Sequence, residues 1–448
     1  MHKIDTVYIK INDNLDDNIL EISSRLALNY GLFEKQKITF KLGRLKEEFY
    51  LSLIETDEDM LVLNSVNLKK LALYPEQNYN FKINEGEIRI GPVIGIMVDI
   101  VKNRNKPFGA QTLFIKQALE IARKSGQLCF AFSPYNVDWK HKKIQGYTYL
   151  KNNWVKSVFP FPDVIYPRSR ISSTEKLRIR KRFKQTGVIL LNYKLLDKWE
   201  AYKILAQNPA LESHLPDTRF VFDFTRQIDI MLNKYEAVYL KPICGEQGKN
   251  IIKVIKPKKK GIYEYYYSCD KRQFKGKATS INELYFSLKN VIGNRRYIVQ
   301  ERIKLIKWQN KIVDVRVLVQ KGYGNRWEIT GIACRIGNNG SITSNLSSGG
   351  TAKRLEDILK LYFNNQKMEQ ILSKIKFVSL KSAETLENKI GICAEMGIDL
   401  GIDRQGKVWF IEANLRPARK IFTLIGETET RLKSIENPLL YAKYLAGF

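Results

Sequence analysis

Short runs in which apolar and polar residues alternate fill the first ninety positions of the chain. The clearest runs are TVYIKI, KITFKL, EFYLSLIE, YNFKIN and EIRI, with Gly, Asn and Asp between them. Alternation with a period of two is typical of antiparallel strands that bury one face. We therefore predict a small β-rich domain over residues 1–90, with one or two short helices around ILEISSRLALNYG.

The pattern changes at Gly91, where GPVIGIMVDI is nearly continuously apolar, as expected for a strand that is covered on both faces. A helical pattern follows in AQTLFIKQALEIARKSG and ends near Gly126, and LCFAFS is a second buried strand. The stretch IQGYTYLKNNWVKSVF is predicted to form a hairpin that turns at Asn152 and Asn153. This order of elements predicts an α/β domain over residues 91–190.

Strands alternate with helices and hairpins over residues 191–448, which predicts an α+β domain. YEAVYLKPI and NIIKVIK flank a loop with two glycines, and YIVQERI, IVDVRVLVQ and WEITGIACRIG are further strands. We predict helices for DKWEAYKILAQN, for AKRLEDILKLYFNN and for about residues 379–396. GIDLGIDRQGKVWFIEAN is predicted to form a closing hairpin.

Composition narrows the class of protein. The chain has 448 residues, of which 44% are hydrophobic, enough for two or three domains. No run approaches the ~18 apolar residues of a membrane span, and acids occupy the place of a signal peptide's apolar segment. We therefore expect a cytoplasmic protein with no membrane partner. The five cysteines and three histidines are scattered, so a disulfide framework, a cysteine zinc site and histidine chemistry are not expected.

The charge is strongly positive, with 75 Lys and Arg against 46 Asp and Glu, a net +29. Such a field attracts polyanions, including nucleic acid, nucleotides and acidic peptides, although solubility alone is an equally weighted explanation. The most basic segment, SSTEKLRIRKRFKQTG, has the capping-box spacing of a helix from Ser172 to Glu175. It lacks interleaved aromatic residues for stacking bases, so a solvated helix face is the favoured interpretation.

The loop between YEAVYLKPI and NIIKVIK is a candidate phosphate site. Its sequence, CGEQGKN, lacks the GxxxxGK[ST] spacing of a P-loop, and it lies between two strands, not before a helix. Phosphates would have to be held there by backbone N–H groups and by nearby lysines such as Lys241. An ordinary basic hairpin is the alternative.

The closing hairpin is a candidate metal site. Glu412 and Asn414 are two residues apart and therefore share one face of a strand. The RQGK turn returns either Asp399 or Asp403 to their side. Two carboxylates and an amide oxygen suit Mg²⁺ that is shared with substrate phosphates. Surface acids on a plain hairpin are the alternative, which the apolar neighbours of Glu412 disfavour.

Two further segments are candidates for anion binding. In DVRVLV, Asp314 and Arg316 share a face of a strand, where Arg316 could pair with a phosphate or carboxylate, or with Asp314 in a purely structural pair. SNLSSGGTA precedes a predicted helix, and Asn345, the hydroxyl groups and the backbone N–H groups of this loop could bind an anion.

Taken in order, these segments resemble the ATP-grasp superfamily. The similarity rests on two lysines, the CGEQGKN loop, VQERI, DVR, NLSSGG and the GID…EAN hairpin, over about 250 residues from Asn192 on. Over nearly its whole length the chain is similar to the YheC/YheD group of ATP-grasp proteins, described as endospore coat-associated. FGAQTLFI, VIYPRS, KPICGEQGKNI and GIDLGIDRQGKVWFIEANLRP carry this closer similarity.

The resemblance implies an ATP-grasp fold, in which two α+β subdomains enclose ATP, preceded by an α/β pre-ATP-grasp domain. A mobile lid subdomain would span roughly residues 205–303. The implied reaction is that of an ATP- and Mg²⁺-dependent carboxylate–amine ligase, which forms an acylphosphate and then an amide. Phosphoryl transfer needs mainly positioning and charge neutralisation, so the scarcity of histidine is no obstacle.

The resemblance also implies roles for individual residues. Three of them, Lys241, Arg316 and Arg335, would be catalytic. Arg316 and Arg335 would stabilise the transferring phosphoryl group or acylphosphate, and Lys241 would neutralise the ATP phosphates together with Lys198. The residues that bind ATP would be Lys198, Lys241, Gly245, Gly248, Gln300, Glu301, Ile303 and Asn345. Two Mg²⁺ ions would be held by Asp399, Glu412 and Asn414, because the G-x-D pattern favours Asp399 over Asp403. EANLRP departs from the E-V-N-x-x-P-G form of peptide ligases, and its neighbourhood supplies Arg416 and Arg419 as candidates for binding an acidic substrate.

The leading hypothesis is therefore an ATP-grasp ligase that acts on an amino acid, a peptide or a protein side chain and is linked to the endospore coat, with coat proteins as partners. The net charge favours an acidic peptide or protein as substrate. One alternative is an ATP-binding structural component of the coat without turnover. The other is a nucleic-acid-binding protein, which the lack of stacking aromatics disfavours.

Overall fold

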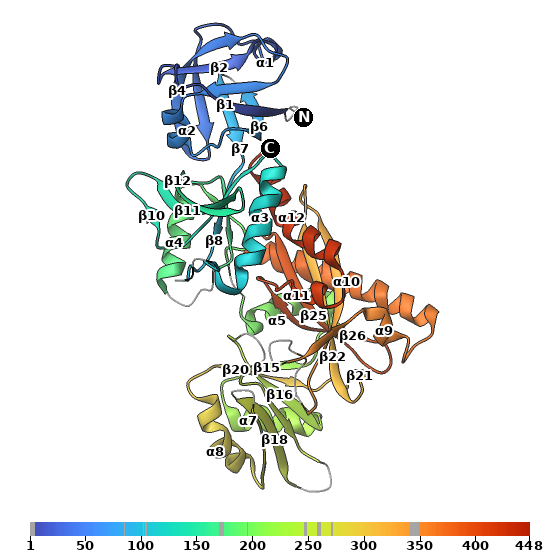
Figure 1. The fold of residues 1–448 in the computed structure, drawn as a ribbon. Helices are drawn as coiled ribbons and strands as arrows, with labels where there is room; N and C mark the ends of the chain where they lie inside the picture. The colour runs from blue at the N-terminus through green and yellow to red at the C-terminus, as the bar shows by residue number, and fades with distance from the viewer. Residues whose placement is uncertain are drawn as a thin grey trace. The chain divides into compact units, whose positions relative to one another are not determined.

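The computed structural model of the chain (Figure 1) describes residues 5–84, 86–101, 103, 105–169, 174–194, 196–245, 249–257, 261–269, 272–340, 344 and 349–448. The chain divides into two compact units. The first comprises Met1–Tyr193, Lys321–Arg326 and Ile435–Phe448, and the second comprises Lys194–Gln320 and Trp327–Ser434. The domain boundaries that we placed at residues 90 and 190, and the extent of the lid, remain predictions.

A closed β-barrel begins the first unit, with strand order β1-β5-β2-β4-β3-β7-β6. Its strands are β1 Asp5–Ile11, β2 Ile19–Ser23, β3 Lys37–Leu42, β4 Leu45–Ile54, β5 Met60–Leu63, β6 Gln77–Asn84 and β7 Glu87–Gly91, with helices α1 Ser24–Asn29 and α2 Ser65–Leu71. The alternation in KITFKL buries Ile38, Phe40 and Leu42 while their neighbours remain accessible. The five alternating runs of the sequence are all strands of this barrel.

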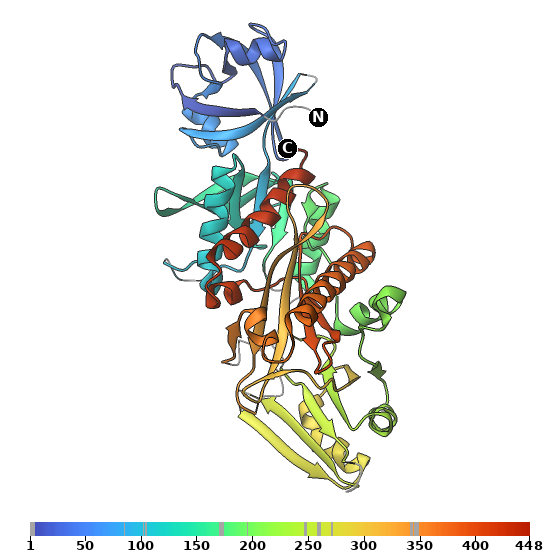
Figure 2. The same cartoon turned by 90° about the vertical axis from the view of Figure 1, so that its right-hand side faces the viewer.

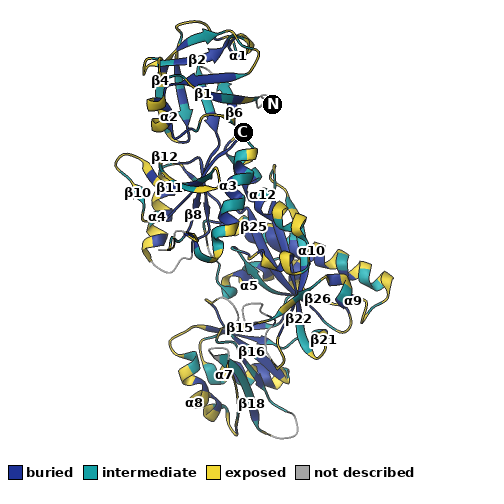
Figure 3. Cartoon of the chain, in the orientation of Figure 1, coloured by how far each residue is buried: buried dark blue, intermediate teal, exposed yellow. Residues whose placement is uncertain are grey.

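A mixed sheet follows in the first unit, with the order β10-β11-β9-β8-β13-β14 and β12 paired with β11. Its elements are β8 Val93–Met97, η1 Gly109–Gln111, α3 Thr112–Lys124, β9 Leu128–Phe132, β10 Val137–Asp138, β11 Lys143–Leu150, β12 Asn153–Pro160, β13 Val164–Pro167, α4 Thr174–Gln185 and β14 Ile189–Leu190. β8 and β9 are buried along their whole length (Figure 3), as their continuous apolar sequences predict. Ser172, the predicted cap of α4, lies outside the described residues.

One hydrophobic core extends through the barrel and this sheet, and it includes Phe81 and Ile90 of the barrel together with Phe130 and Phe159 of the sheet. The end of the chain belongs to the same unit. Its last residue, Phe448, lies under the Arg89 guanidinium, with 4.7 Å between the guanidinium carbon and the ring centroid.

The second unit contains two sheets. The first has the order β15-β20-β16-β17-β18-β19. Its elements, with two helices that precede it, are α5 Lys198–Ala206, α6 Pro209–Glu212, β15 Thr218–Val221, α7 Phe224–Lys234, β16 Ala237–Pro242, β17 Ile252–Ile255, β18 Tyr263–Cys269, β19 Arg272–Ala278, α8 Ile281–Ile292 and β20 Tyr297–Glu301. Helices α7 and α8 cover one face of this sheet (Figure 1). They bury Val238 and Leu240 of β16, so the intervening residues of that strand point to the opposite face.

The other sheet has the order β24-β23-β22-β25-β26, with β21 paired with β22. Its elements are β21 Lys307–Trp308, β22 Lys311–Lys321, β23 Trp327–Ile336, β24 Thr351–Lys353, α9 Leu355–Leu359, α10 Asn365–Ile390, β25 Glu395–Ile402 and β26 Val408–Asn414, followed by α11 Lys420–Leu424 and α12 Thr428–Leu445. The long helix α10, orange to red in Figure 2, packs on this sheet. β25 is buried along its whole length.

The helices of this region differ from our predictions at their boundaries. The first is shorter than AKRLEDILKLYFNN, because Thr351–Lys353 pairs as a strand with β23. The second begins at Asn365 and not near residue 379. The Asn364 side chain caps this helix, α10, by accepting from the Lys367 backbone N–H. It ends before residue 396, because Gly391 adopts a positive φ of 86° and β25 begins at Glu395. Among the described residues, no helix is both long and apolar enough to cross a membrane.

A buried ion pair lies beside β25. Arg419 donates to the Glu395 carboxylate and, at 3.0 Å, to the carbonyl of Ser434. Gln320 donates to the same carboxylate at 3.0 Å. The side chains of Arg419 and Glu395 are 4% and 0% exposed. The expectation that Arg419 binds an acidic substrate is therefore wrong, because its guanidinium is buried against Glu395.

We predict that Arg419→Met lowers the free energy of unfolding by about 3 kcal/mol, because it leaves the Glu395 charge buried and unpaired. The double variant Arg419→Met with Glu395→Leu should recover most of this loss, since neither charge remains. Urea denaturation measures both effects. The exposed Arg178 provides the control Arg178→Met, and a single Arg419→Met variant as stable as that control would contradict the prediction.

Candidate functional site

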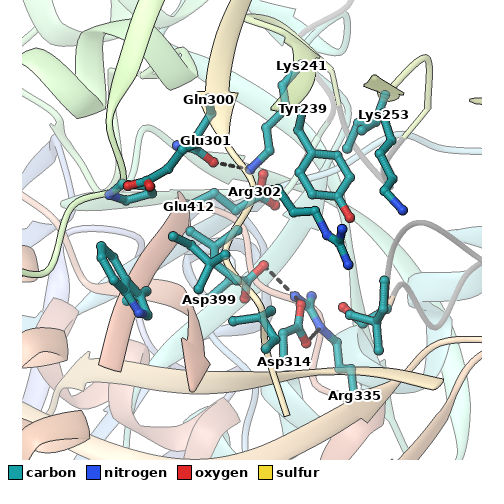
Figure 4. Close-up of a pocket in the computed structure, with 18 of the residues that line it drawn as sticks. Tyr239, Lys241, Lys253, Gln300, Glu301, Arg302, Asp314, Arg335, Asp399 and Glu412 are labelled. Atoms are coloured by element: carbon teal, nitrogen blue, oxygen red, sulfur yellow. Dashed lines mark hydrogen bonds and ion pairs between the residues drawn. The ribbon is translucent and has the colours of Figure 1, made fainter. Parts of the chain in front are cut away.

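A cavity of about 590 Å³ lies in the second unit. Figure 4 shows side chains from both sheets of the unit pointing into it. Most of the residues that the sequence singled out line this cavity: Lys198, Lys241, Gly245, Gln300, Glu301, Ile303, Arg335, Asp399 and Glu412. Two others, Gly248 and Asn345, lie outside the described residues. Residues that are up to 214 positions apart in the sequence are therefore brought to one place.

One wall is a row of side chains across neighbouring strands. Gln300 of β20 is opposite Tyr239 of β16, which is opposite Lys253 of β17, which in turn is opposite Tyr266 of β18. All four line the cavity. Tyr239 and Lys241 are two residues apart and share the face of β16 that α7 and α8 leave uncovered.

Lys241 is held at the inner end of this wall. Its ammonium donates to Gln300 Oε1 at 2.6 Å, and the Gln300 amide donates to the Thr218 hydroxyl at 2.8 Å. Burial lowers the pKa of Lys241 to about 8, partly offset by the nearby charge of Glu412. Burial therefore disfavours the protonated form of the Lys241 side chain, and a bound anion would favour that form.

Lys198 approaches the same space from the first turn of α5. The Asp197 side chain caps this helix by accepting from the backbone N–H of Glu200 at 2.8 Å. The Lys198 ammonium donates to the carbonyl of Gly245 at 3.0 Å and lies 3.6 Å from Glu412 Oε2. Lys198 thus links Gly245, at the start of the CGEQGKN loop, to Glu412 of β26.

The floor of the cavity is formed by Asp314, Arg335 and Asp399, and Arg316 lies against Asp399 behind it. Arg335 binds Asp314 through Nε at 2.7 Å and Nη2 at 2.5 Å, and its Nη2 also lies 2.7 Å from Asp399 Oδ2. Arg316 binds Asp399 through Nε at 2.5 Å and Nη2 at 3.1 Å. Burial by itself would raise the pKa of Asp399, but the two guanidiniums outweigh it and hold the pKa below its usual value. The two guanidiniums therefore favour the charged form of Asp399.

The predicted metal ligands occupy one part of the hairpin. Asp399 of β25 is paired in register with Glu412 of β26, and Gly397 with Asn414. Asp403 is excluded from this group, because its carboxylate accepts from the turn's backbone N–H groups and, at 3.0 Å, from the Trp409 indole. The residue pattern alone did not decide whether Asp399 or Asp403 lies beside Glu412 and Asn414. The geometry of the turn favours Asp399.

The donor types of this group suit Mg²⁺, which prefers carboxylate and amide oxygens. Glu412 lines the cavity and faces a lysine, whereas both oxygens of Asp399 accept from arginines. The Asn414 side-chain oxygen accepts from the backbone N–H of Arg416 at 2.9 Å. Within the described residues, no three carboxylate, histidine or cysteine side chains form a ready metal cluster. Asn414 is not among the residues that line the cavity, so Glu412 is the predicted ligand best placed for Mg²⁺ that is shared with a bound phosphate.

Arg316 and Arg335 differ in their access to the cavity. Arg335 lines it, whereas Arg316 is not among the lining residues and lies against Asp399. The sequence weighed a structural pair of Asp314 with Arg316. In the structure each of these residues has a different partner, because the pairs form across strands and not along one strand. The catalytic, ATP-binding and metal-binding roles of all the predicted residues remain predictions.

Several cavity residues escaped the sequence reasoning, among them Tyr239, Lys253, Tyr266, Arg302 and Trp409. For Tyr239 a signal was present, since it precedes Lys241 by two residues and must share its face. Lys253, Tyr266 and Trp409 depend on how β17, β18 and β26 pair with their neighbours, and a single sequence does not contain that register. Arg302 directly follows the end of β20.

Comparisons with known proteins agree with this architecture. A family model described as YheC/D like ATP-grasp matches residues 187–445. Endospore coat-associated protein YheD of Bacillus subtilis (strain 168) is 28% identical over 407 residues, which cover 87% of this chain and 86% of that protein. Endospore coat-associated protein YheC of the same organism is 26% identical over 326 residues, 70% of this chain and 87% of that protein.

Among solved structures, D-alanyl-alanine synthetase A from Vibrio cholerae O1 biovar eltor str. N16961 aligns with a TM-score of 0.46 and 12% identity, covering 78% of this chain and 99% of that one. The family match, which spans more than half of the chain, defines an ATP-grasp protein with the ATP-grasp fold. Within that class, the chain belongs to the YheC/D-like ATP-grasp family.

Lys241 gives a prediction about stability and pH. Its pKa of about 8 in the folded chain lies below the ordinary value of 10.5, so between these values the unfolded chain binds more protons and stability rises with pH. The penalty for burying the charge is complete below pH 8. We therefore predict that Lys241→Met raises Tm relative to the wild type at pH 7, and that this advantage shrinks at pH 9.5.

Thermal unfolding of both proteins at the two pH values measures the effect. The exposed Lys376 on α10 supplies the control Lys376→Met, whose Tm should track the wild type at each pH. A difference between Lys241→Met and wild type that stays constant from pH 7 to pH 9.5 would rule out the lowered pKa.

Proposed function

We propose that this chain is an ATP- and Mg²⁺-dependent ligase that joins a carboxylate to an amine through an acylphosphate. The observation that carries the proposal is the arrangement of Lys198 and Lys241 around Glu412 above a buried floor of arginines and aspartates. Phosphoryl transfer is accelerated mainly by fixed charges that neutralise the phosphates. The family assignment supports ATP as the phosphoryl donor.

In the proposed reaction, an oxygen of the substrate carboxylate attacks the γ-phosphorus of ATP, and the bond to the β-phosphate bridging oxygen breaks to release ADP. The amine nitrogen then attacks the acyl carbon, phosphate leaves, and the nitrogen loses a proton. Lys198 and Lys241 hold the phosphates, and the backbone from Gln300 to Ile303 holds the adenine and ribose. Arg335 stabilises the transferring group. Mg²⁺ held by Glu412 would neutralise phosphate charge.

Arg335 suits this role better than Arg316. A guanidinium has five N–H donors, and the bonds of Arg335 to Asp314 and Asp399 use Nε and Nη2. Nη1 takes no part in these bonds, and Arg335 lines the cavity. Arg316 is turned toward Asp399 and acts as a positioning residue, since it holds that carboxylate in place.

A second candidate function is that of an ATP-binding component of the endospore coat without turnover. The observation that favours it is the state of Asp399, whose two oxygens both accept from arginines, leaving Glu412 as the carboxylate open to a metal. The names of YheD and YheC as endospore coat-associated proteins support a place at the coat for either candidate.

We predict that Lys241→Ala weakens Mg²⁺–ATP binding at pH 7 by roughly tenfold or more, since a hydrogen bond to a charged group contributes about 1.5–3 kcal/mol. Glu412→Ala should abolish the dependence of ATP affinity on Mg²⁺. Isothermal titration calorimetry with and without Mg²⁺ measures both. The exposed α10 residues Lys376 and Glu369 provide the matched controls Lys376→Ala and Glu369→Ala, which should bind as the wild type does.

Unchanged affinity in both cavity variants would refute this assignment of the site. Turnover is tested separately by measuring ADP release across pairs of amino acids and peptides that offer a carboxylate and an amine. ADP release that needs both substrates supports the ligase. ATP binding with no ADP release for any pair supports the structural component.

A further inference from the structure

The first unit contains a second concave surface, with a volume of about 1340 Å³. It is built by the end of β1, the β3–β4 turn, α2 and the residues after it, the β10–β11 connection and the end of β12. We call it the basic groove. None of its residues belongs to the candidate ATP site, which lies wholly in the second unit.

Charge is distributed unevenly in the basic groove. Its positive residues are Arg44, Lys46, Lys69, Lys70, Lys142, Lys143 and Lys156, whereas its single acid is Asp138. Two of the lysines are paired with acids outside the groove, Lys46 with Glu87 at 2.8 Å and Lys70 with Glu47 at 2.7 Å. Asp138 is occupied by His141, with 2.7 Å between its Oδ2 and the ring Nδ1. The exposed ammonium groups of Lys69, Lys143 and Lys156 have no carboxylate partner among the described residues. The groove therefore attracts anions and repels cations.

The groove is also apolar between these charges. Ile11, Val66 and Val158 line it with 48%, 59% and 48% of their surface exposed. Leu45 and Tyr74 line it as well and are half-buried. Exposed aliphatic side chains among unpaired lysines are a combination typical of binding surfaces, because burying them against a partner removes apolar area from water.

The geometry of β12 favours an extended polypeptide. Five consecutive residues of this strand, from Lys156 to Pro160, line the groove. Neighbouring side chains on a strand point to opposite faces. Because residues of both faces line the groove, the groove runs along the edge of the strand. Among the described strands, β12 pairs only with β11. Its other edge can therefore offer backbone N–H and C=O groups to an added strand.

The groove is held open by direct contacts between the barrel and the sheet. The Arg44 backbone N–H donates to the carbonyl of Phe161 at 2.9 Å. The Tyr74 hydroxyl donates to the Ser157 hydroxyl at 3.2 Å. Because Tyr74 is tied down in this way, the groove does not present a row of exposed aromatic rings, which is what single-stranded nucleic acid needs for stacking.

We propose that the basic groove is a docking site for an acidic polypeptide segment whose carboxylates pair with the lysines and whose aliphatic side chains cover Val66 and Val158. The proposal deepens the function proposed above by naming the class of partner, an acidic peptide or protein. Docking is measured without ATP, so a failure of ligase activity and a failure of docking are separate results.

The probe is a fluorescein-labelled peptide of Glu-Glu-Leu repeats, and fluorescence anisotropy measures its Kd for the full chain. The test variant carries Lys69→Glu, Lys143→Glu and Lys156→Glu. The control carries Lys124→Glu, Lys181→Glu and Lys376→Glu, three exposed lysines outside the groove, and changes the net charge equally. We expect the groove variant to bind at least about tenfold more weakly, as three lost ion pairs imply, and the control to bind nearly as the wild type does.

The apolar part of the proposal has its own test. Val66→Ser with Val158→Ser should weaken binding of the Glu-Glu-Leu peptide but leave a Glu-Glu-Ser peptide unaffected. Binding of a labelled oligothymidylate with the same charge as the peptide tests whether the groove prefers nucleic acid. Far-ultraviolet circular dichroism and Tm verify folding. If the glutamate variant does not fold, the changes Lys69→Gln, Lys143→Gln and Lys156→Gln replace it, since they remove charge without reversing it.

Three results would overturn the proposal. Equal weakening in the groove and control variants would mean that the peptide senses only the overall field of the protein. Tighter binding of oligothymidylate than of the peptide, lost in the groove variant, would make the groove a nucleic-acid site. No measurable binding of the peptide by the wild type would mean that the groove docks no acidic segment.

Discussion

The candidate active site depends on one carboxylate held between two guanidiniums. Asp399 on β25 accepts from Arg316 on β22 and from Arg335 on β23, and Arg335 also binds Asp314. Leaving any of these charges buried and unpaired would cost several kcal/mol, so the cluster exists only while all four groups are present. It therefore fixes the register in which Arg316 lies opposite Asp399 and makes the floor of the cavity rigid before any substrate arrives.

Because two arginines and two aspartates cancel, this floor adds no net charge to the cavity. The attraction for anions must come from the walls, where Lys198 and Lys241 are supplied by a helix and by a strand of the other sheet. Ammonium groups on separate elements can adjust to a ligand one at a time, whereas the floor cannot. The floor of the cavity therefore has a fixed geometry. The lysines of the walls can change position and protonation when an anion binds. Lys241, with its lowered pKa, is the most responsive of them.

The sequence predicted the strands and the cavity residues wherever the information is local. The apolar run before the glycine loop placed Lys241 on a strand, and the tight RQGK turn placed either Asp399 or Asp403 beside Glu412, of which the structure pairs Asp399. The sequence did not predict the partner of Arg316. Asp314 shares a strand face with this arginine, but the pair forms with Asp399 across strands, between residues that are 83 positions apart in the sequence. A single sequence does not show which distant residues become neighbours. The early start of α10 is a different kind of miss, because the capping signal at Asn364 is local and was present in the sequence.

The net charge of +29 had two readings from composition, a general aid to solubility or an attraction for particular partners. The structure shows where part of this charge lies. Nine lysines and arginines line the cavity of the second unit against four carboxylates, two of which are bound by arginines. The basic groove has seven against one. Charge spread only for solubility has no reason to collect in concave surfaces, where like charges repel one another and lower stability. The excess of basic over acidic residues in the two hollows is what the two proposals require, a nucleotide in one and an acidic chain in the other.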